Sequence, residues 1–149
     1  MEKLKAVATM LKARAMPEQV DAEITEASSL SSFSEAEGGL LAARLEYTGE
    51  VQLWSAGGEL TDLVAALTAW LDANAGRHDR FDGLTGAPVG KGRSDVVLTF
   101  RFSEEITYVE DAAYTGVDRL EWGGRVWKRA APAPGVIQGD EVAVTPQPE

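Results

Sequence analysis

A change in the spacing of apolar residues constrains the fold of this chain more than any other feature. Between residues 60 and 71, large apolar residues recur at intervals of three, one, three, three and one, the spacing of one face of an α-helix. Residues 43–54 and 96–102 instead alternate between apolar and polar side chains, which is typical of β-strands. This combination predicts an α+β fold in which a helix packs on a sheet.

The predicted helix lies in the stretch LTDLVAALTAWLDANAG, residues 60–76. Thr61 can cap its start, Asp62 complements the positive end of the helix dipole, and Gly76 can end the helix in a left-handed turn. We expect its apolar stripe to pack against the sheet. The stripe consists of Leu60, Leu63, Val64, Leu67, Trp70 and Leu71.

The remaining segments are less regular. Residues 1–15 predict a first helix, and Pro17 suits the first turn of a second, short one. Residues 28–39 are rich in Ser and Gly and predict a loop or a frayed helix. Residues 77–94 contain several glycines and a proline, so we expect a long loop there, and loops of this length are usually functional.

Three further segments predict strands. Residues 40–54 indicate two strands, or one strand broken near Thr48-Gly49, and residues 95–108 indicate a strand with a break around 103–105. Gly123-Gly124 lies between short apolar runs and predicts a closing hairpin.

These elements predict a single α+β domain over residues 1–130. Its sheet would be mixed and mainly antiparallel, with helices packed on one face. Residues 131–149 are rich in Pro and Ala and predict a flexible tail.

Composition argues against several classes of function. The chain has 149 residues, no cysteine and a formal net charge of −10. The charge argues against binding a nucleic-acid backbone, and the missing cysteines remove thiolate metal sites and cysteine nucleophiles. The first residues lack the apolar core of a signal peptide, so we expect a cytoplasmic product.

The sequence contains two weak chemical motifs. GAPVGKGRS, residues 86–94, has the wrong spacing for a phosphate loop and precedes a strand rather than a helix. His78, Asp79 and Asp82 could bind a divalent metal, although a solvated loop is the simpler interpretation. A small metal-dependent hydrolase or nucleotide-binding protein using this loop is therefore the alternative function.

The tryptophans suggest contact surfaces. Trp70 lies on the helical stripe and is expected in the core, whereas Trp54 is out of phase with the apolar residues before it. The two that flank the Gly-Gly turn fit an interface and a small satellite core equally well. The predicted subunit or partner interface residues are Trp54, Trp122, Arg125 and Trp127.

The order of these elements resembles the gpR-like tail completion family of temperate phages with contractile tails. In that family a Tyr-containing strand precedes an acidic turn, a helix with AWL at its core, and a strand that ends in acidic residues. The matching positions are Tyr47, Asp62, residues 69–71 and the strand over 96–106. LEWGGRVW is similar to the hairpin that closes those chains, and the resemblance covers roughly residues 38–128.

The resemblance implies a tail-terminator-like fold and a structural virion protein that is neither an enzyme nor a cofactor carrier. Such a protein caps the tail tube as a hexameric ring and joins it to the neck or head. Its implied partners are further copies of itself, the tail tube and tail sheath proteins, and neck or head–tail connector proteins. DNA passes through without specific binding, and no membrane is involved.

The implied location is the junction of tail and neck in the virion, after assembly in the host cytoplasm. In a ring of this kind an acidic lumen would let DNA slide by like-charge repulsion. Asp79 and Asp82 are the predicted lumen-lining residues.

Overall fold

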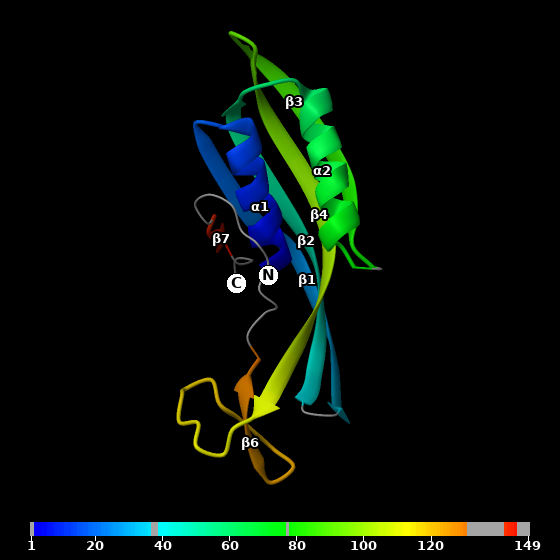
Figure 1. Cartoon of the computed structure of the whole chain (residues 1–149), viewed down its shortest axis with the longest axis vertical. Helices are drawn as coiled ribbons and strands as arrows, with labels where there is room; N and C mark the ends of the chain where they lie inside the picture. Colours follow the sequence, from blue (N-terminus) through cyan, green and yellow to red (C-terminus); the bar gives the residue numbers. More distant parts are fainter. Residues whose placement is uncertain (1, 37–38, 77, 131–141, 146–149) are drawn as a thin grey trace. The chain divides into compact units, whose positions relative to one another are not determined.

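The computed structural model of the chain describes residues 2–36, 39–76, 78–130 and 142–145. It confirms the predicted α+β fold, with two helices and a mostly antiparallel, curled sheet among the described residues (Figure 1). The helices are α1 (Glu2–Ala15) and α2 (Leu60–Asn74). The strands are β1 (Gln19–Ala36), β2 (Gly39–Ala56), β3 (Arg80–Gly90), β4 (Arg93–Glu110), β5 (Leu120–Trp122), β6 (Arg125–Arg129) and β7 (Val144–Thr145).

The strands form one sheet in the order β5-β6-β4-β2-β1-β7, and β3 also pairs with β4. The pairs β3–β4, β4–β6 and β5–β6 are antiparallel, whereas β7 runs parallel to β1. The chain divides into two compact units: unit 1 comprises residues 1–27, 47–103 and 135–149, and unit 2 comprises residues 28–46 and 104–134. Strands β1, β2 and β4 contribute residues to both units.

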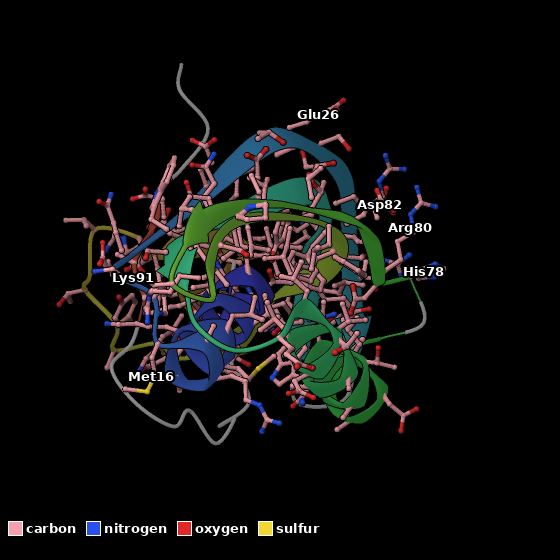
Figure 2. The ribbon with its side chains drawn as sticks, turned by 90° about the horizontal axis from the view of Figure 1, so that it is seen from above. Met16, Glu26, His78, Arg80, Asp82 and Lys91 are labelled. Carbon is pink, nitrogen blue, oxygen red and sulfur yellow. The ribbon has the colours of Figure 1, made fainter. Side chains whose placement is uncertain are left out.

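In unit 1, α1 and α2 lie on the same face of the sheet (Figure 1). Strand side chains alternate between the buried face under the helices and the opposite face, so the core forms between helices and sheet. The largest fully buried side chains of this unit are Leu4, Val7, Leu11, Ile24, Tyr47, Val51, Leu53, Leu67, Leu98, Phe100 and Phe102. Viewed from above, the ribbon of the sheet curves around the side chains that fill the interior (Figure 2).

Strand β2 is continuous, although the sequence suggested that it could break near Thr48-Gly49. Gly49 is instead a packing position, because a Cβ atom there would lie 2.6 Å from Cδ2 of Leu4 on α1. The backbone N–H of Leu4 donates to the hydroxyl of Tyr47 at 3.3 Å. The missing side chain therefore lets helix and strand approach each other closely.

Unit 2 contains the predicted closing hairpin, formed by β5 and β6. Gly123 and Gly124 have φ angles of 64° and 73°, which is the backbone of a type I′ hairpin turn. Trp127 is 2% exposed, and its indole N–H donates to the carbonyl of Trp122 at 2.9 Å. The hairpin thus provides unit 2 with a small core of its own.

Two sequence predictions are wrong at β1. Neither a short helix after Pro17 nor a loop at 28–36 forms, because β1 runs from Gln19 to Ala36. Val20 and Ile24 are four residues apart, a spacing that fits both a helix face and a strand face. The buried Ala22 between them completes an alternating pattern, and a small alanine is easily overlooked as a core residue.

The predicted loop at residues 77–94 is also wrong, because most of it is β3 and its antiparallel turn into β4. Register shifts occur between Phe81 and Gly83 and between Pro88 and Gly90, so the glycines and the proline accompany bulges in an edge strand. The turn itself uses positive φ angles at Gly90, Lys91 and Gly92. Most side chains of β3 are exposed, so its sequence does not alternate between apolar and polar residues and does not predict a strand.

Helix α2 is confirmed, but its apolar stripe is only partly buried. Leu63 and Leu67 are buried, whereas Leu60 and Val64 are exposed. Glu59 is the N-cap and makes no side-chain cap hydrogen bond, and Ala75 rather than Gly76 ends the helix, in an extended conformation. Of the helices in the described part of the chain, neither is long and apolar enough to cross a membrane.

Candidate assembly surfaces

The first surface lies on unit 1 and is centred on Trp54. This side chain is 40% exposed because it follows the buried Leu53 on β2 and so points to the sheet face without helices. Its indole N–H donates to a carboxylate oxygen of Asp21 on β1 at 2.8 Å. The ring is therefore held at its polar edge and leaves apolar area open, as aromatic contact residues often do.

The backbone next to Trp54 is strained and is held by β4. Ser55 and Met16 have φ angles of 56° and 45°, which are uncommon for residues with a side chain. The Arg93 guanidinium donates to the carbonyl oxygens of Ser55 and Met16, both at 2.8 Å. The carboxylate of Asp95 accepts the N–H of Ser55 at 2.8 Å. These contacts fix the strand end that presents Trp54.

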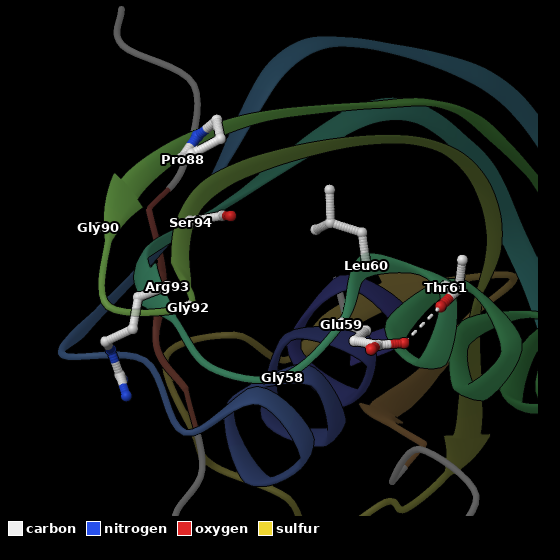
Figure 3. A pocket seen from close by; sticks show the side chains of 9 residues that line it. All are labelled: Gly58, Glu59, Leu60, Thr61, Pro88, Gly90, Gly92, Arg93 and Ser94. Carbon is white, nitrogen blue, oxygen red and sulfur yellow. Dashed lines mark hydrogen bonds between the residues drawn. The ribbon is translucent and has the colours of Figure 1, made fainter.

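A shallow hollow of about 470 Å³ lies between the β3–β4 turn and the start of α2 (Figure 3). Leu60 and Pro88 give it an apolar wall, and Arg93 is its basic lining residue. Arg93 already donates to backbone carbonyls, and Glu59 brings negative charge to the hollow. With its arginine engaged and a carboxylate beside it, the hollow is electrostatically unfavourable for a phosphate.

The second surface lies on unit 2 and is formed by a stacked aromatic pair. Phe33 is 47% exposed, and its ring lies 5.5 Å from the ring of Trp122, with 12° between the planes. Beside the pair, Arg125 contacts Glu35 at 2.5 Å and Glu110 at 3.7 Å. The predicted interface residues Trp122 and Arg125 thus lie together with Phe33.

The two tryptophans of the hairpin have different roles. The ring of Trp127 lies 6.4 Å from that of half-buried Trp122 and is almost fully buried, so it belongs to the satellite core and supports Trp122. Sequence reasoning missed Phe33, because it lies in the Ser-rich stretch that predicted a loop. The signal that could have revealed it is one large aromatic residue among small polar ones.

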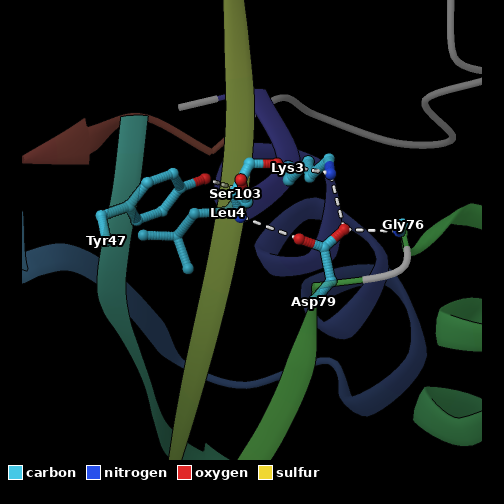
Figure 4. A network of polar contacts seen from close by, with 6 residues as sticks. All are labelled: Lys3, Leu4, Tyr47, Gly76, Asp79 and Ser103. Carbon is cyan, nitrogen blue, oxygen red and sulfur yellow. Dashed lines mark hydrogen bonds and ion pairs between the residues drawn. The ribbon is translucent and has the colours of Figure 1, made fainter. Parts of the chain in front are cut away.

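Asp79 is a structural residue of unit 1. Its side chain is 0% exposed and accepts hydrogen bonds from Lys3 Nζ at 2.5 Å, from the Gly76 N–H at 2.5 Å and from the Ser103 N–H at 2.8 Å (Figure 4). It thereby links α1, the end of α2 and β4. Because the carboxylate does not reach solvent in this conformation, we do not propose Asp79 as a lumen-lining residue.

The other members of the His78 segment point outward. His78 is exposed, and Asp82 pairs with Arg80 at 2.7 Å (Figure 2). Among the described residues, no group of three His, Cys, Asp or Glu side chains is placed to hold a metal ion. The residues that suggested a hydrolase or a nucleotide-binding loop thus do not form one site. Asp79 is a buried structural carboxylate, Asp82 belongs to a surface ion pair, and residues 90–92 form a hairpin turn.

The described residues therefore define a small α+β protein in which the aromatic side chains of Trp54 and Phe33 are exposed. A family model described as P2 phage tail completion protein R (GpR) matches residues 1–125. The chain belongs to this family and is a phage tail completion protein, a component of the virion that interacts with other tail components. No curated protein and no solved structure gives a significant match.

The family match confirms the resemblance seen in the sequence and extends it at the N-terminus. The resemblance began near residue 38, whereas the match also includes α1 and all of β1. It ends at Arg125, the first residue of β6. Residues 126–149 lie beyond the matched region.

Proposed function

We propose that this protein completes the tail by capping the tail tube as a hexameric ring that also meets the neck or head. Membership of the GpR family is the observation that carries the proposal, since it makes the chain a tail completion protein. The tube of a contractile tail is six-fold, and a cap that matches it needs the same symmetry. The role is structural and involves no catalysis.

A ring requires heterologous contacts, in which one patch meets a different patch on the next copy. The two surfaces described above are unlike. One has a single indole fixed by a carboxylate, and the other has an aromatic stack beside an arginine. We propose Trp54, Trp122 and Arg125 as contact residues of the ring or of its neighbours, with Trp127 as their buried support.

The charge of the chain favours passage of DNA without binding. Six copies of a chain with a net charge of −10 carry 6 × −10 = −60. Like-charge repulsion in the lumen would keep the phosphate backbone from adhering. Of the two acidic residues predicted for the lumen, Asp82 has a partly exposed side chain and is the one we propose.

We propose the tail tube protein, the tail sheath protein and the neck or head–tail connector proteins as partners. The tube end would meet one face of the ring, and the neck would meet the other. This arrangement places the protein at the junction of tail and neck.

Native mass spectrometry and negative-stain imaging test this function, using the protein alone and with polymerising tail tube protein. We expect six-fold rings, or tubes of uniform length capped at one end. Trp54→Ala and Trp122→Ala should reduce capping, whereas His78→Ala, in an exposed residue outside both surfaces, should not. A protein that stays monomeric and ignores the tube in both conditions would refute the proposal.

A further inference from the structure

Residues 142–145, which we term the C-terminal arm, pack on α1 and β1 of unit 1. Val144 and Thr145 form β7 and pair in parallel with Ala22 and Glu23. Val142 is 6% exposed, and its N–H donates to the hydroxyl of Thr9 at 2.9 Å. The arm thus adds an extended backbone to the edge of the sheet, which is a mode of peptide recognition.

Thr9 gives this groove an acceptor for a backbone N–H. Among the residues that the structure describes, Thr9 is the one polar residue that is buried as a whole, with 1% of its surface exposed. Its hydroxyl donates to the Lys5 carbonyl at 2.8 Å and accepts the N–H of Val142. Withdrawal of the arm would break this hydrogen bond between Val142 and Thr9, which is a net loss of stability.

Charge also suits an arm of this sequence. Lys5 and Lys12 lie four residues before and three residues after Thr9, so they flank it on one face of α1. The residues that precede Val142 in the chain are Asp140 and Glu141. The groove combines a hydroxyl with a strand edge, and the arm offers it a backbone and a valine.

The arm lies outside the region that the family model matches. The family match ends at residue 125, while α1 and β1, which form the groove, lie inside it. Residues 131–141 connect Ala130, which follows β6, to Val142. Twelve peptide steps span up to about 40 Å, compared with a radius of gyration of about 15 Å for a domain of this size. The connection is long enough for the arm to reach a second copy.

We propose that in the assembled ring the C-terminal arm of each copy docks in the α1–β1 groove of the neighbouring copy. This inference rests on the ring proposed above. The contacts come from backbone groups and one valine, and they are the same whichever copy supplies the arm. If neighbouring copies exchange their arms, every groove is still filled. The contact that one chain makes with itself then becomes a contact between subunits, as in domain swapping.

The lack of cysteine allows a direct cross-linking test. Glu23→Cys is placed on one chain and Thr145→Cys on another chain that carries a larger tag, and the two are mixed before rings or capped tubes form. These positions are register partners, and strand partners about 4.8 Å apart lie within the range of a disulfide. After oxidation we expect a mixed dimer on a non-reducing gel.

Gln19→Cys provides the matched control, because this exposed residue lies on the same face of β1, four positions out of register. If rings form but the band of the mixed dimer is no stronger than in this control, the exchange of arms is overturned. The proposed function is not affected by that result. The Glu23→Cys, Thr145→Cys double variant would then close within one chain. Absence of rings and capped tubes from the unmodified protein would instead refute the proposed function, and the exchange with it.

A substitution in the arm gives a second readout. Val142→Asp places a charge in the groove, so an exchanged arm predicts a rise of about tenfold or more in the dissociation constant between subunits. An arm that stays on its own chain predicts a lower melting temperature of the monomer and an unchanged dissociation constant. Ala143→Asp, at an exposed position of the same arm, should change neither.

Discussion

At the scale of single residues, Asp79 makes the most consequential polar contacts of unit 1. Asp79→Ala would remove the acceptor of Lys3 and of two backbone N–H groups. Lys3 is partly exposed and can recover water, so we expect a loss of about 2–3 kcal/mol in the free energy of unfolding. Urea denaturation measures this loss.

Asp82→Ala is the matched control for Asp79→Ala, because it removes a carboxylate three residues away that pairs with Arg80 at the surface. Surface ion pairs contribute about 0–1 kcal/mol. Equal effects of the two substitutions would contradict the structural role assigned to Asp79.

Tyr114 gives unit 2 a distinct titration at high pH. Its hydroxyl donates to the carboxylate of Asp118, and this hydrogen bond, with smaller effects of desolvation and of the charges of Asp118 and Asp111, raises the pKa of the phenol. A raised pKa favours the neutral phenol in the folded state. The resulting stabilisation is therefore complete at neutral pH and is lost as the pH rises through the raised pKa, above about 10.

Absorbance titration of the tyrosines tests this assignment. Tyr114→Phe should remove a late-titrating group, and Asp118→Asn should lower the pKa of Tyr114 towards its ordinary value. An unchanged titration curve in Asp118→Asn would show that the hydrogen bond does not control the pKa.

At the scale of elements, the packing of α1 on β2 depends on the glycine between them. Gly49→Ala would place a methyl group 2.6 Å from Cδ2 of Leu4, which is fully buried. Overpacking of this kind costs about 1–3 kcal/mol. Gly83→Ala on β3 is the control, because a Cβ there meets nothing within 4 Å. Thermal unfolding should separate the two variants, and equal melting temperatures would contradict the close approach.

The elements that could be predicted from the sequence are those with large residues in one clear period. Helix α2 and strand β4 have such patterns, and both were predicted. Strand β1 has a small core residue, Ala22, between two residues whose spacing also suits a helix, and β3 is an exposed edge strand with glycines near its bulges. In both cases tertiary pairing determines the structure, and local pattern does not.

The residues of the candidate surfaces could be predicted from the sequence only in part. Trp54 was identified because its phase on β2 departs from that of its buried neighbours. The hairpin predicted by Gly123-Gly124 does not specify which tryptophan points inward, so half-buried Trp122 and fully buried Trp127 could not be distinguished. The role of Asp79 depends on Lys3 and Ser103, which are distant in sequence, and no local signal reveals that contact.

At the scale of the whole molecule, net charge should govern the salt dependence of assembly. Copies that each carry −10 repel one another, and raising the salt from about 0.01 M to about 0.1 M shortens the Debye length from about 30 Å to about 10 Å. We expect the population of rings, measured by analytical ultracentrifugation, to rise over this range. Trp54→Ala should assemble poorly at both salt concentrations, and a ring population that falls with salt would indicate attraction between charged patches instead.

Arg93, which holds two of the residues of unit 1 with positive φ angles, also has an evolutionary consequence. Arg93 fixes the positive φ angles of Met16 and Ser55 through their carbonyl groups, with a planar fork that lysine cannot reproduce. Selection on this region would therefore act at position 93 more strongly than at the strained positions. Relatives with glycine at positions 16 and 55 would adopt the same backbone without strain. In such relatives Arg93 could be replaced without loss of this backbone, so the residues at positions 16, 55 and 93 should covary.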